Sequence, residues 1–274
     1  MLLRGSNRVS KASLLLVAVL AGGLAGAPVA AADDDGRAGG WRFEVTPYIW
    51  LPEIHGDVRI RDRSADFEVG FDDVFDLLGD GDLFGAMGHF EARSGRLALF
   101  ADVVGTVVDD ETDGQIARQD VDVDLDADFV TAEFGAAYRF LARDRFDLEG
   151  LAGGRYNYWY SEVTVKGPLQ ERRRDTSQEF VDPFFGLRGG VRLAEQWSLV
   201  ARGDVGGFGA GSELAWLALG GVRWDMPWRL GAASLAAFAV YKVYDLDYET
   251  GAGGGERALD IQLRGPALGL GFNF

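Results

Sequence analysis

Residues 41–51, WRFEVTPYIWL, alternate strictly between two sets of side chains. One set is apolar throughout and consists of Trp41, Phe43, Val45, Pro47, Ile49 and Leu51. The other set holds both charged residues of the stretch, Arg42 and Glu44. Successive side chains of a β-strand point to opposite faces, so this period of two predicts a strand with one apolar and one polar face.

The same alternation recurs along the chain and predicts nine more strands. They fall within 84–93, 96–107, 130–140, 146–158, 180–193, 197–208, 214–224, 228–240 and 266–274. Their apolar faces carry no Asp, Glu, Lys or Arg, although 26% of the chain is charged. In the segment 228–240 we assign Ala236, Phe238 and Val240 to the apolar, outward face.

The connections between these strands alternate in length. Short connections are expected at 94–95, 141–145, 194–196 and 226–227, and mostly longer, polar ones at 52–82, 109–120, 166–178 and 249–256, with the short connection 209–212 as an exception. Outer-membrane barrels join their strands by short periplasmic turns and longer external loops. The pattern therefore predicts an all-β fold, a closed antiparallel transmembrane β-barrel of ten strands, with eight or twelve strands as alternatives.

The first 32 residues have the features of a secretory signal peptide. Three cationic residues precede an apolar run, and Ala30–Ala32 supply the small residues that signal peptidase reads. We expect a signal peptide over 1–32, a short linker over 33–40 and the barrel domain over 41–274. The predicted location is the cell outer membrane, reached through the inner membrane.

Composition excludes several classes of protein. The chain has 43 acidic and 27 basic residues, and its formal net charge is −16. Nucleic-acid binding needs a cationic surface, so we expect no nucleic acid as a partner. The absence of cysteine excludes disulfides and thiolate metal sites.

Aromatic residues near the strand ends predict two girdles at the level of the lipid headgroups. One girdle is expected to contain Trp41, Phe146, Trp197, Trp224 and Trp228. The other is expected to contain Trp50, Tyr156, Tyr158, Tyr160, Tyr241 and Tyr244.

Two stretches resemble known proteins. The last residues alternate Leu268, Leu270, Phe272 and Phe274 with small or polar residues, and this resembles the C-terminal signature of Gram-negative outer-membrane barrels. The resemblance implies that these four residues form a signal for the barrel-assembly machinery. Residues 41–103, with PYIWLP at 47–52 and MGHFEARSGR at 87–96, resemble a family of largely uncharacterised proteobacterial outer-membrane β-barrel proteins. That resemblance implies a fold and a location but no activity.

The inward faces of the expected strands carry charges of both signs. The expected lumen charge ladder comprises Glu91, Arg93, Arg96, Asp102, Glu133, Arg139, Glu149, Arg155, Arg188, Arg192, Arg202, Asp204, Arg223 and Arg229. Charges that are buried together must be paired to be tolerated. Paired charges that fill a narrow lumen are therefore the first interpretation, and a polar conduit is the second.

Catalytic chemistry has little support in the sequence. The chain has two histidines, the side chains that exchange protons near neutral pH. His55 lies in an external segment beside Glu53 and Asp57, and His89 is expected to face the lumen two residues from Glu91. We predict no catalytic residue, no cofactor and no defined metal site.

Three segments of the expected loops are candidates for other roles. Asp120, Asp122, Asp124, Asp126 and Asp128 lie at a period of two and predict either a solvated strand rim or a site for Ca²⁺ or Mg²⁺. The run Glu171–Arg174 is a candidate for contact with lipopolysaccharide phosphates. The segment Phe71–Leu78 has apolar residues at helical spacing and predicts a short amphipathic helix over the outer mouth.

The sequence thus predicts an integral outer-membrane barrel without enzymatic activity. Its expected role is structural or porin-like passage of small solutes through a largely filled lumen. The alternatives are an outer-membrane enzyme of lipase or protease type and an external binding or adhesion barrel. The expected partners are outer-membrane lipid, lipopolysaccharide, the barrel-assembly machinery and divalent cations at the acidic loops.

Overall fold

A computed structural model describes residues 40–60, 63–74, 83–116, 119–166, 171–250 and 257–274. The chain divides into two units, Met1–Asp35 and Gly36–Phe274. The first unit lies outside the described residues, and with it the expected signal peptide.

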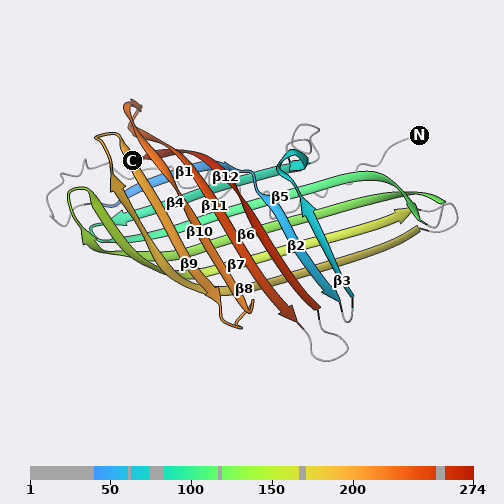
Figure 1. The fold of residues 1–274 in the computed structure, drawn as a ribbon. Coiled ribbons are helices and arrows are strands. Elements are labelled where there is room, and N and C mark those ends of the chain that lie inside the picture. The colour runs from blue at the N-terminus through green and yellow to red at the C-terminus, as the bar shows by residue number, and fades with distance from the viewer. Residues whose placement is uncertain (1–39, 61–62, 75–82, 117–118, 167–170, 251–256) are drawn as a thin grey trace. The chain divides into compact units, whose positions relative to one another are not determined.

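The described residues of the second unit form an antiparallel sheet whose elements are shown in Figure 1. Its strands are β1 (Arg42–Trp50), β2 (Glu53–Ile60), β3 (Arg63–Val69), β4 (Leu83–Ser94), β5 (Leu97–Ile116), β6 (Gln119–Ala142), β7 (Phe146–Lys166), β8 (Glu171–Arg192), β9 (Trp197–Gly207), β10 (Leu214–Leu230), β11 (Ala233–Thr250) and β12 (Arg257–Asn273).

The sheet closes into a barrel because β1 pairs with both β4 and β12. Trp50 lies opposite Ala267 and Glu53 lies opposite Arg264, so β1 and β2 continue in one register along β12. The break between them is at Pro52, which has no N–H to donate. Among the described strands β3 pairs with β2 alone, so the wall has ten strands and the β2–β3 hairpin adds none. The predicted ten-stranded antiparallel barrel is confirmed.

The two ends of the barrel differ. At one end, here the turn end, β4–β5, β6–β7, β8–β9 and β10–β11 are joined by turns of two to four residues. At the other end, the loop end, β5 to β8 are 20 to 24 residues long and run side by side in Figure 1. A strand needs only about 9–11 residues to cross a bilayer, so these four extend well beyond one. The expected loops 109–120 and 166–178 are therefore wrong over most of their length, because both are largely strand.

The expected turn at 226–227 is also wrong. β10 continues to Leu230, and the turn lies at Gly231 and Ala232, where Gly231 adopts a φ of 59°. Pro227 instead occupies a shift in register between β10 and β11, a place where a missing N–H costs no regular ladder bond.

This displacement of the turn reverses the faces of the next strand. Ala236 has no exposed surface, and Phe238 lies under the Arg223 guanidinium with its ring centroid 4.8 Å away. Ala236, Phe238 and Val240 therefore face the lumen, and our assignment of them to the outward face is wrong. Ala239 is on the exposed face of β11.

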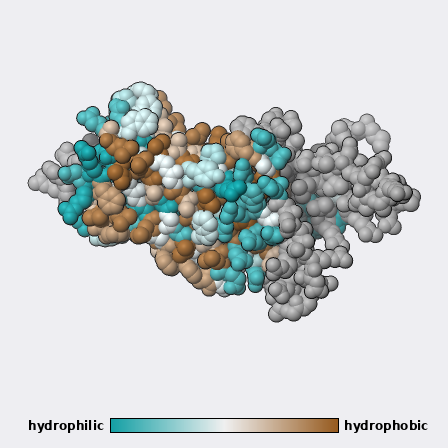
Figure 2. Space-filling view, viewed as in Figure 1, coloured by the Kyte–Doolittle hydropathy of each residue, from teal (hydrophilic) through white to brown (hydrophobic). Residues whose placement is uncertain are grey.

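The outer face of the barrel is apolar around the strands. Exposed apolar side chains include Ile49, Phe134, Phe185, Leu187, Leu199 and Leu268. Figure 2 shows apolar side chains gathered between more hydrophilic zones of the described surface. At the turn end Trp197, Trp224 and Trp228 pack in a row, with ring centroids 5.8 Å and 5.5 Å apart.

The girdle expected at the loop end is wrong in two positions. Trp50 and Tyr244 are 4% and 3% exposed and lie inside the barrel. Tyr241 is exposed on the outer face, as expected.

The predicted helix at Phe71–Leu78 is described only in part. Residues 71–74 are helical, and the Gly70 N–H donates to Asp73 Oδ2 over 2.8 Å. Residues 75–78 lie outside the described residues. No helix in the described part of the chain is long and apolar enough to cross a membrane.

Candidate functional site in the barrel lumen

The middle of the lumen holds the central ion-pair layer, which consists of Glu133, Arg155, Arg202 and Asp204. Arg155 on β7 donates through Nε to Glu133 over 2.8 Å and through Nη2 to Asp204 over 2.7 Å. Arg202 on β9 donates to the same two carboxylates over 2.7 and 2.8 Å. The four side chains are at most 11% exposed. Two cations and two anions thus neutralise one another where water is largely excluded.

Aromatic rings enclose this layer. The Arg155 guanidinium lies 5.0 Å from the Phe184 ring centroid and 4.9 Å from that of Tyr244. Rings at this distance attract a cation through their negative faces. The Arg155 side chain itself has no exposed surface.

Nearer the turn end lies a second set of charges, the turn-end ion-pair group of Glu91, Arg93, Arg139, Glu149 and Arg188. Glu149 accepts two hydrogen bonds from Arg93, at 2.6 and 2.9 Å, one from Arg139 at 3.0 Å and one from Arg188 at 2.9 Å. Glu91 pairs with Arg93 at 2.8 Å and with Arg188 at 2.6 Å. The group therefore contains one more cation than anions.

Arg223 links strands that are not neighbours. It donates from β10 to Asp225 over 2.8 Å and to Glu44 on β1 over 3.0 Å. Because β11 and β12 separate β10 from β1, this contact spans part of the lumen.

Three members of the expected lumen charge ladder lie at the turn end and make no ion pair among the described residues. Arg96 and Arg229 are exposed there, and Arg229 donates to the carbonyl oxygen of Ala232. Arg192 is exposed there as well. The structure thus brings together the inner members of the ladder and leaves these three apart.

His89 is hydrogen-bonded to Asp102, with 3.2 Å between His89 Nδ1 and Asp102 Oδ2. The Tyr48 hydroxyl donates to the other oxygen of Asp102 over 2.8 Å. The expected neighbour of His89, Glu91, makes its hydrogen bonds to arginines instead. A histidine held by a carboxylate can exchange protons, but within the described residues no serine or threonine hydroxyl joins the pair.

Sequence reasoning missed Lys242. This residue is 8% exposed, and its Nζ lies 4.6 Å from the Trp50 ring centroid and 5.7 Å from that of Tyr48. The sequence contains a signal. Lys242 lies six positions after Ala236, and an even offset along a strand places two side chains on the same face. A lysine does not face lipid at this depth without cost, so its parity identifies the lumen side of β11.

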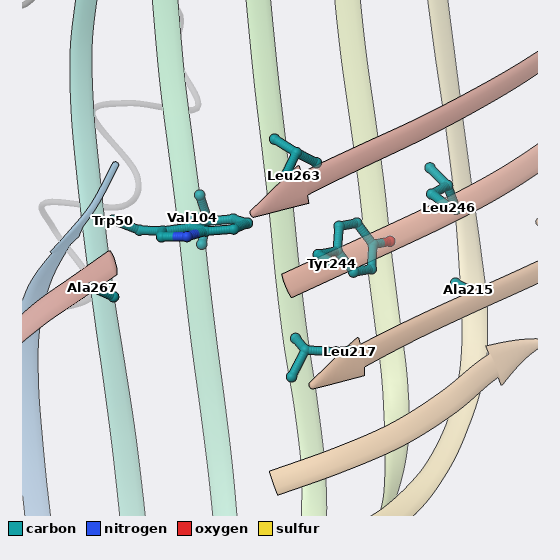
Figure 3. Close-up of a cluster of buried hydrophobic side chains, with 8 residues drawn as sticks. All are labelled: Trp50, Val104, Ala215, Leu217, Tyr244, Leu246, Leu263 and Ala267. Atoms are coloured by element: carbon teal, nitrogen blue, oxygen red, sulfur yellow. The ribbon is translucent and has the colours of Figure 1, made fainter. Parts of the chain in front are cut away.

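Above the central ion-pair layer the lumen becomes apolar. The apolar cluster consists of Trp50, Val104, Ala215, Leu217, Tyr244, Leu246, Leu263 and Ala267. Figure 3 shows these side chains projecting between strands on facing sides of the barrel, with Trp50 lying flat beside Val104. Trp159, Phe180 and Tyr248 extend the packing, and the Phe180 and Tyr248 rings stack 4.8 Å apart. The sequence predicts charged side chains along the lumen, whereas this section of the lumen is lined by apolar side chains.

A cavity of 520 Å³, the turn-end cavity, lies below the apolar cluster. Its lining begins at the turn that contains Arg143 and Arg145 and ends at Leu217 and Ala267, which belong to the apolar cluster. Toward the loop end, its lining reaches no further than these residues of the apolar cluster.

The candidate residues of the loop end are only partly described. His55 Nε2 lies 3.8 Å from Glu53 Oε2, and His55 Nδ1 lies 3.7 Å from Glu68 Oε1. Arg173 pairs with Glu162 over 2.5 Å, while the other side chains of 171–174 are outside the described set.

The acidic run lies on β6, which pairs with β5. In this register Asp109 of β5 is opposite Asp126, and Asp113 of β5 is opposite Asp122. The side chains of the run up to Asp126 are not among those described. No group of three or more His, Asp or Glu side chains that could hold a metal occurs in the described part of the chain.

No family model matches the sequence, and no curated protein matches it either. Solved structures with a similar fold include the translocator domain of the autotransporter NalP from Neisseria meningitidis, 11% identical with a TM-score of 0.42, covering 88% of this chain and 90% of that one. The attachment invasion locus protein Ail of Yersinia pestis is 10% identical with a TM-score of 0.32, over 85% of this chain and 98% of that one. The toluene transporter TodX of P. putida is 10% identical with a TM-score of 0.29, over 89% and 91%. These are likenesses of barrel fold alone.

Proposed function

We propose that the protein is an integral outer-membrane barrel with a structural role and no enzymatic activity. In this proposal its lumen is closed, so that solutes do not pass freely. One observation carries the proposal. The lumen is crossed by two layers, the central ion-pair layer and the apolar cluster, whose side chains are almost entirely buried.

The apolar outer face supports the membrane location. Large apolar side chains such as Ile49, Phe185 and Leu268 are more than half exposed, an arrangement that is unfavourable in water over so wide a surface. The tryptophan row at the turn end is typical of a girdle at a membrane interface. In this orientation the turn end faces the periplasm and the acidic loop end faces outward.

A liposome-swelling assay tests the closed lumen. Liposomes that contain the intact protein should swell in isotonic arabinose no faster than empty liposomes. The double variant Trp50→Ala/Arg155→Ala removes one large side chain from each of the two layers and should raise the swelling rate. The matched control Trp228→Ala/Arg229→Ala removes the same residue types from exposed positions outside the lumen and should not.

The proposal fails if the intact protein itself passes arabinose. It also fails if the inner and outer pairs of substitutions raise the rate equally, because leakage would then come from a loosened barrel and not from an opened lumen. Folding of each variant is checked by heat-modifiable migration in gels.

A second candidate function rests on the hydrogen bond between His89 and Asp102. This pair opens on the turn-end cavity and would act as a general base in an outer-membrane hydrolase. Hydrolysis of a p-nitrophenyl ester by the purified barrel, lost in His89→Ala, would favour this candidate. Equal rates in the two proteins would exclude it.

A further inference from the structure

We propose that the turn-end cavity binds a small organic anion, a phosphate monoester or a carboxylate that carries an apolar group. This inference goes beyond the closed lumen, because a barrel can be closed without binding a ligand. It rests on the charge, the free donors and the shape of the cavity.

The charge of the cavity is opposite to that of the chain. Nine of its lining residues are Arg or Lys and seven are Asp or Glu, whereas the whole chain has 27 basic and 43 acidic residues. Low-dielectric walls concentrate the field of such charges within a cleft. The cavity is therefore a place where an anion is attracted to a protein that otherwise repels it.

The ion pairs of the wall leave a cation in excess. In the turn-end ion-pair group, three guanidinium groups share the carboxylates of Glu91 and Glu149. Arg139 makes one hydrogen bond there, through Nε to Glu149, and its two terminal amino groups have no partner among the described residues. A ligand anion would supply the missing acceptor.

The mouth of the cavity adds three more arginines. Arg143, Arg145 and Arg192 line it and make no ion pair within the described residues. The planar guanidinium fork matches carboxylate and phosphate oxygens in pairs, so these side chains suit recognition of such groups.

The opposite wall of the cavity is apolar and favours a ligand whose other end is apolar. Val200, Leu219, Phe238 and Val240 line the cavity from β9, β10 and β11. The volume of 520 Å³ falls in the range of small-molecule sites, about 300–1,000 Å³, and exceeds what inorganic phosphate needs. A ligand with one anionic end and one apolar end therefore complements both walls.

Equilibrium dialysis of the purified full-length barrel in neutral detergent tests the proposal, with phenyl phosphate as the probe and protein-free micelles as the reference. We expect saturable binding of phenyl phosphate. Inorganic phosphate and benzyl alcohol each match only one wall of the cavity. We expect the Kd of each to be about tenfold higher than that of phenyl phosphate, or more.

Two pairs of variants locate the site. Arg143→Gln/Arg192→Gln removes two unpaired guanidinium groups from the mouth and should weaken binding by about tenfold or more. Arg96→Gln/Arg229→Gln removes the same charge from the turn end outside the cavity and should leave the affinity unchanged. Neither pair breaks an ion pair of the described residues, so both should fold, and heat-modifiable migration checks this.

Two results would overturn the proposal. One is the absence of saturable phenyl phosphate binding at millimolar ligand. The other is an equal loss of affinity in both pairs of variants, which would mean that surface charge alone attracts the probe. The assay needs no membrane passage, so its failure is distinguishable from failure of the closed-lumen proposal.

Discussion

At the scale of single residues, Arg155 makes two of the four ion pairs of the central ion-pair layer and is fully buried. It bonds two carboxylates from two other strands and lies between two aromatic rings. Removing one partner of a buried ion-pair network leaves the others uncompensated, and this costs more than the network itself contributes. We therefore expect the barrel to be sensitive to the loss of charge at Arg155.

We expect Arg155→Met to lower the free energy of unfolding by about 3–5 kcal/mol, because Glu133 and Asp204 would then share one arginine in a buried site. Urea-induced unfolding from lipid vesicles measures the change. Arg229→Met, at an exposed turn-end position, should leave the unfolding midpoint unchanged. A loss of less than about 1 kcal/mol for Arg155→Met would show that the layer is solvated.

We expect the outer face of β11 to tolerate bulk but not charge. Ala239 is on the exposed face, and Ala239→Arg should cost about 2–4 kcal/mol if that face meets hydrocarbon. Ala239→Leu, which adds bulk without charge, should cost much less. The same vesicle unfolding assay compares them, and equal costs for the two would contradict a lipid-facing position.

At the scale of the elements, the prediction from sequence was accurate for strands with one charged face. On β7 and β9 the charges of Glu149, Arg155 and Arg202 mark the inner side, because buried charges in lipid are costly and those in the lumen find partners. The structure places these three residues in ion pairs inside the barrel. Which carboxylate each arginine reaches could not be predicted, because the pairs join strands far apart in sequence.

β11 shows where that reasoning stops. Residues 233–241 carry no charge on either face, so alternation alone does not tell lumen from lipid. Pro227 favours a turn in the sequence, whereas a register shift accommodates it inside β10, and this difference reverses the expected faces of the next strand. The apolar cluster was missed for a related reason, because Trp50 and Tyr244 near strand ends resemble girdle residues until their burial is known.

The terminal strand supports a prediction about assembly. β12 closes the barrel against β1, and Phe274 exchanges two backbone hydrogen bonds with Phe43, at 2.8 and 3.2 Å. Because the terminal alternation resembles the assembly signal of outer-membrane barrels, deletion of Phe274 should lower the amount of folded barrel in outer membranes. Heat-modifiable migration of membrane fractions measures this amount.

Refolding of the purified protein separates assembly from stability. The chain without Phe274 should still fold in detergent, since the deletion removes one residue at the edge of the ladder. Normal assembly of the truncated chain in cells would contradict the role of Phe274 as a signal.

At the scale of the whole barrel, the lumen is layered along its axis. The turn-end cavity holds arginines that make no ion pair with any described residue, the central ion-pair layer is neutral and buried, and the apolar cluster packs toward the loop end. Barrels of 16–18 strands leave an aqueous channel, whereas one near eight strands is just wide enough for side chains to fill. With ten strands this wall is at the narrow end of that range, as the proposal of a closed lumen requires.

Single-channel recording of the intact protein in planar bilayers tests the closed lumen most directly. The ion-pair layer and the apolar cluster lie one above the other, so an ion would have to displace both to pass. We therefore expect no stable current steps at moderate voltage, beyond brief events that also occur in protein-free membranes. Large, stable currents of porin type from the intact, folded protein would contradict the account and identify a general diffusion channel.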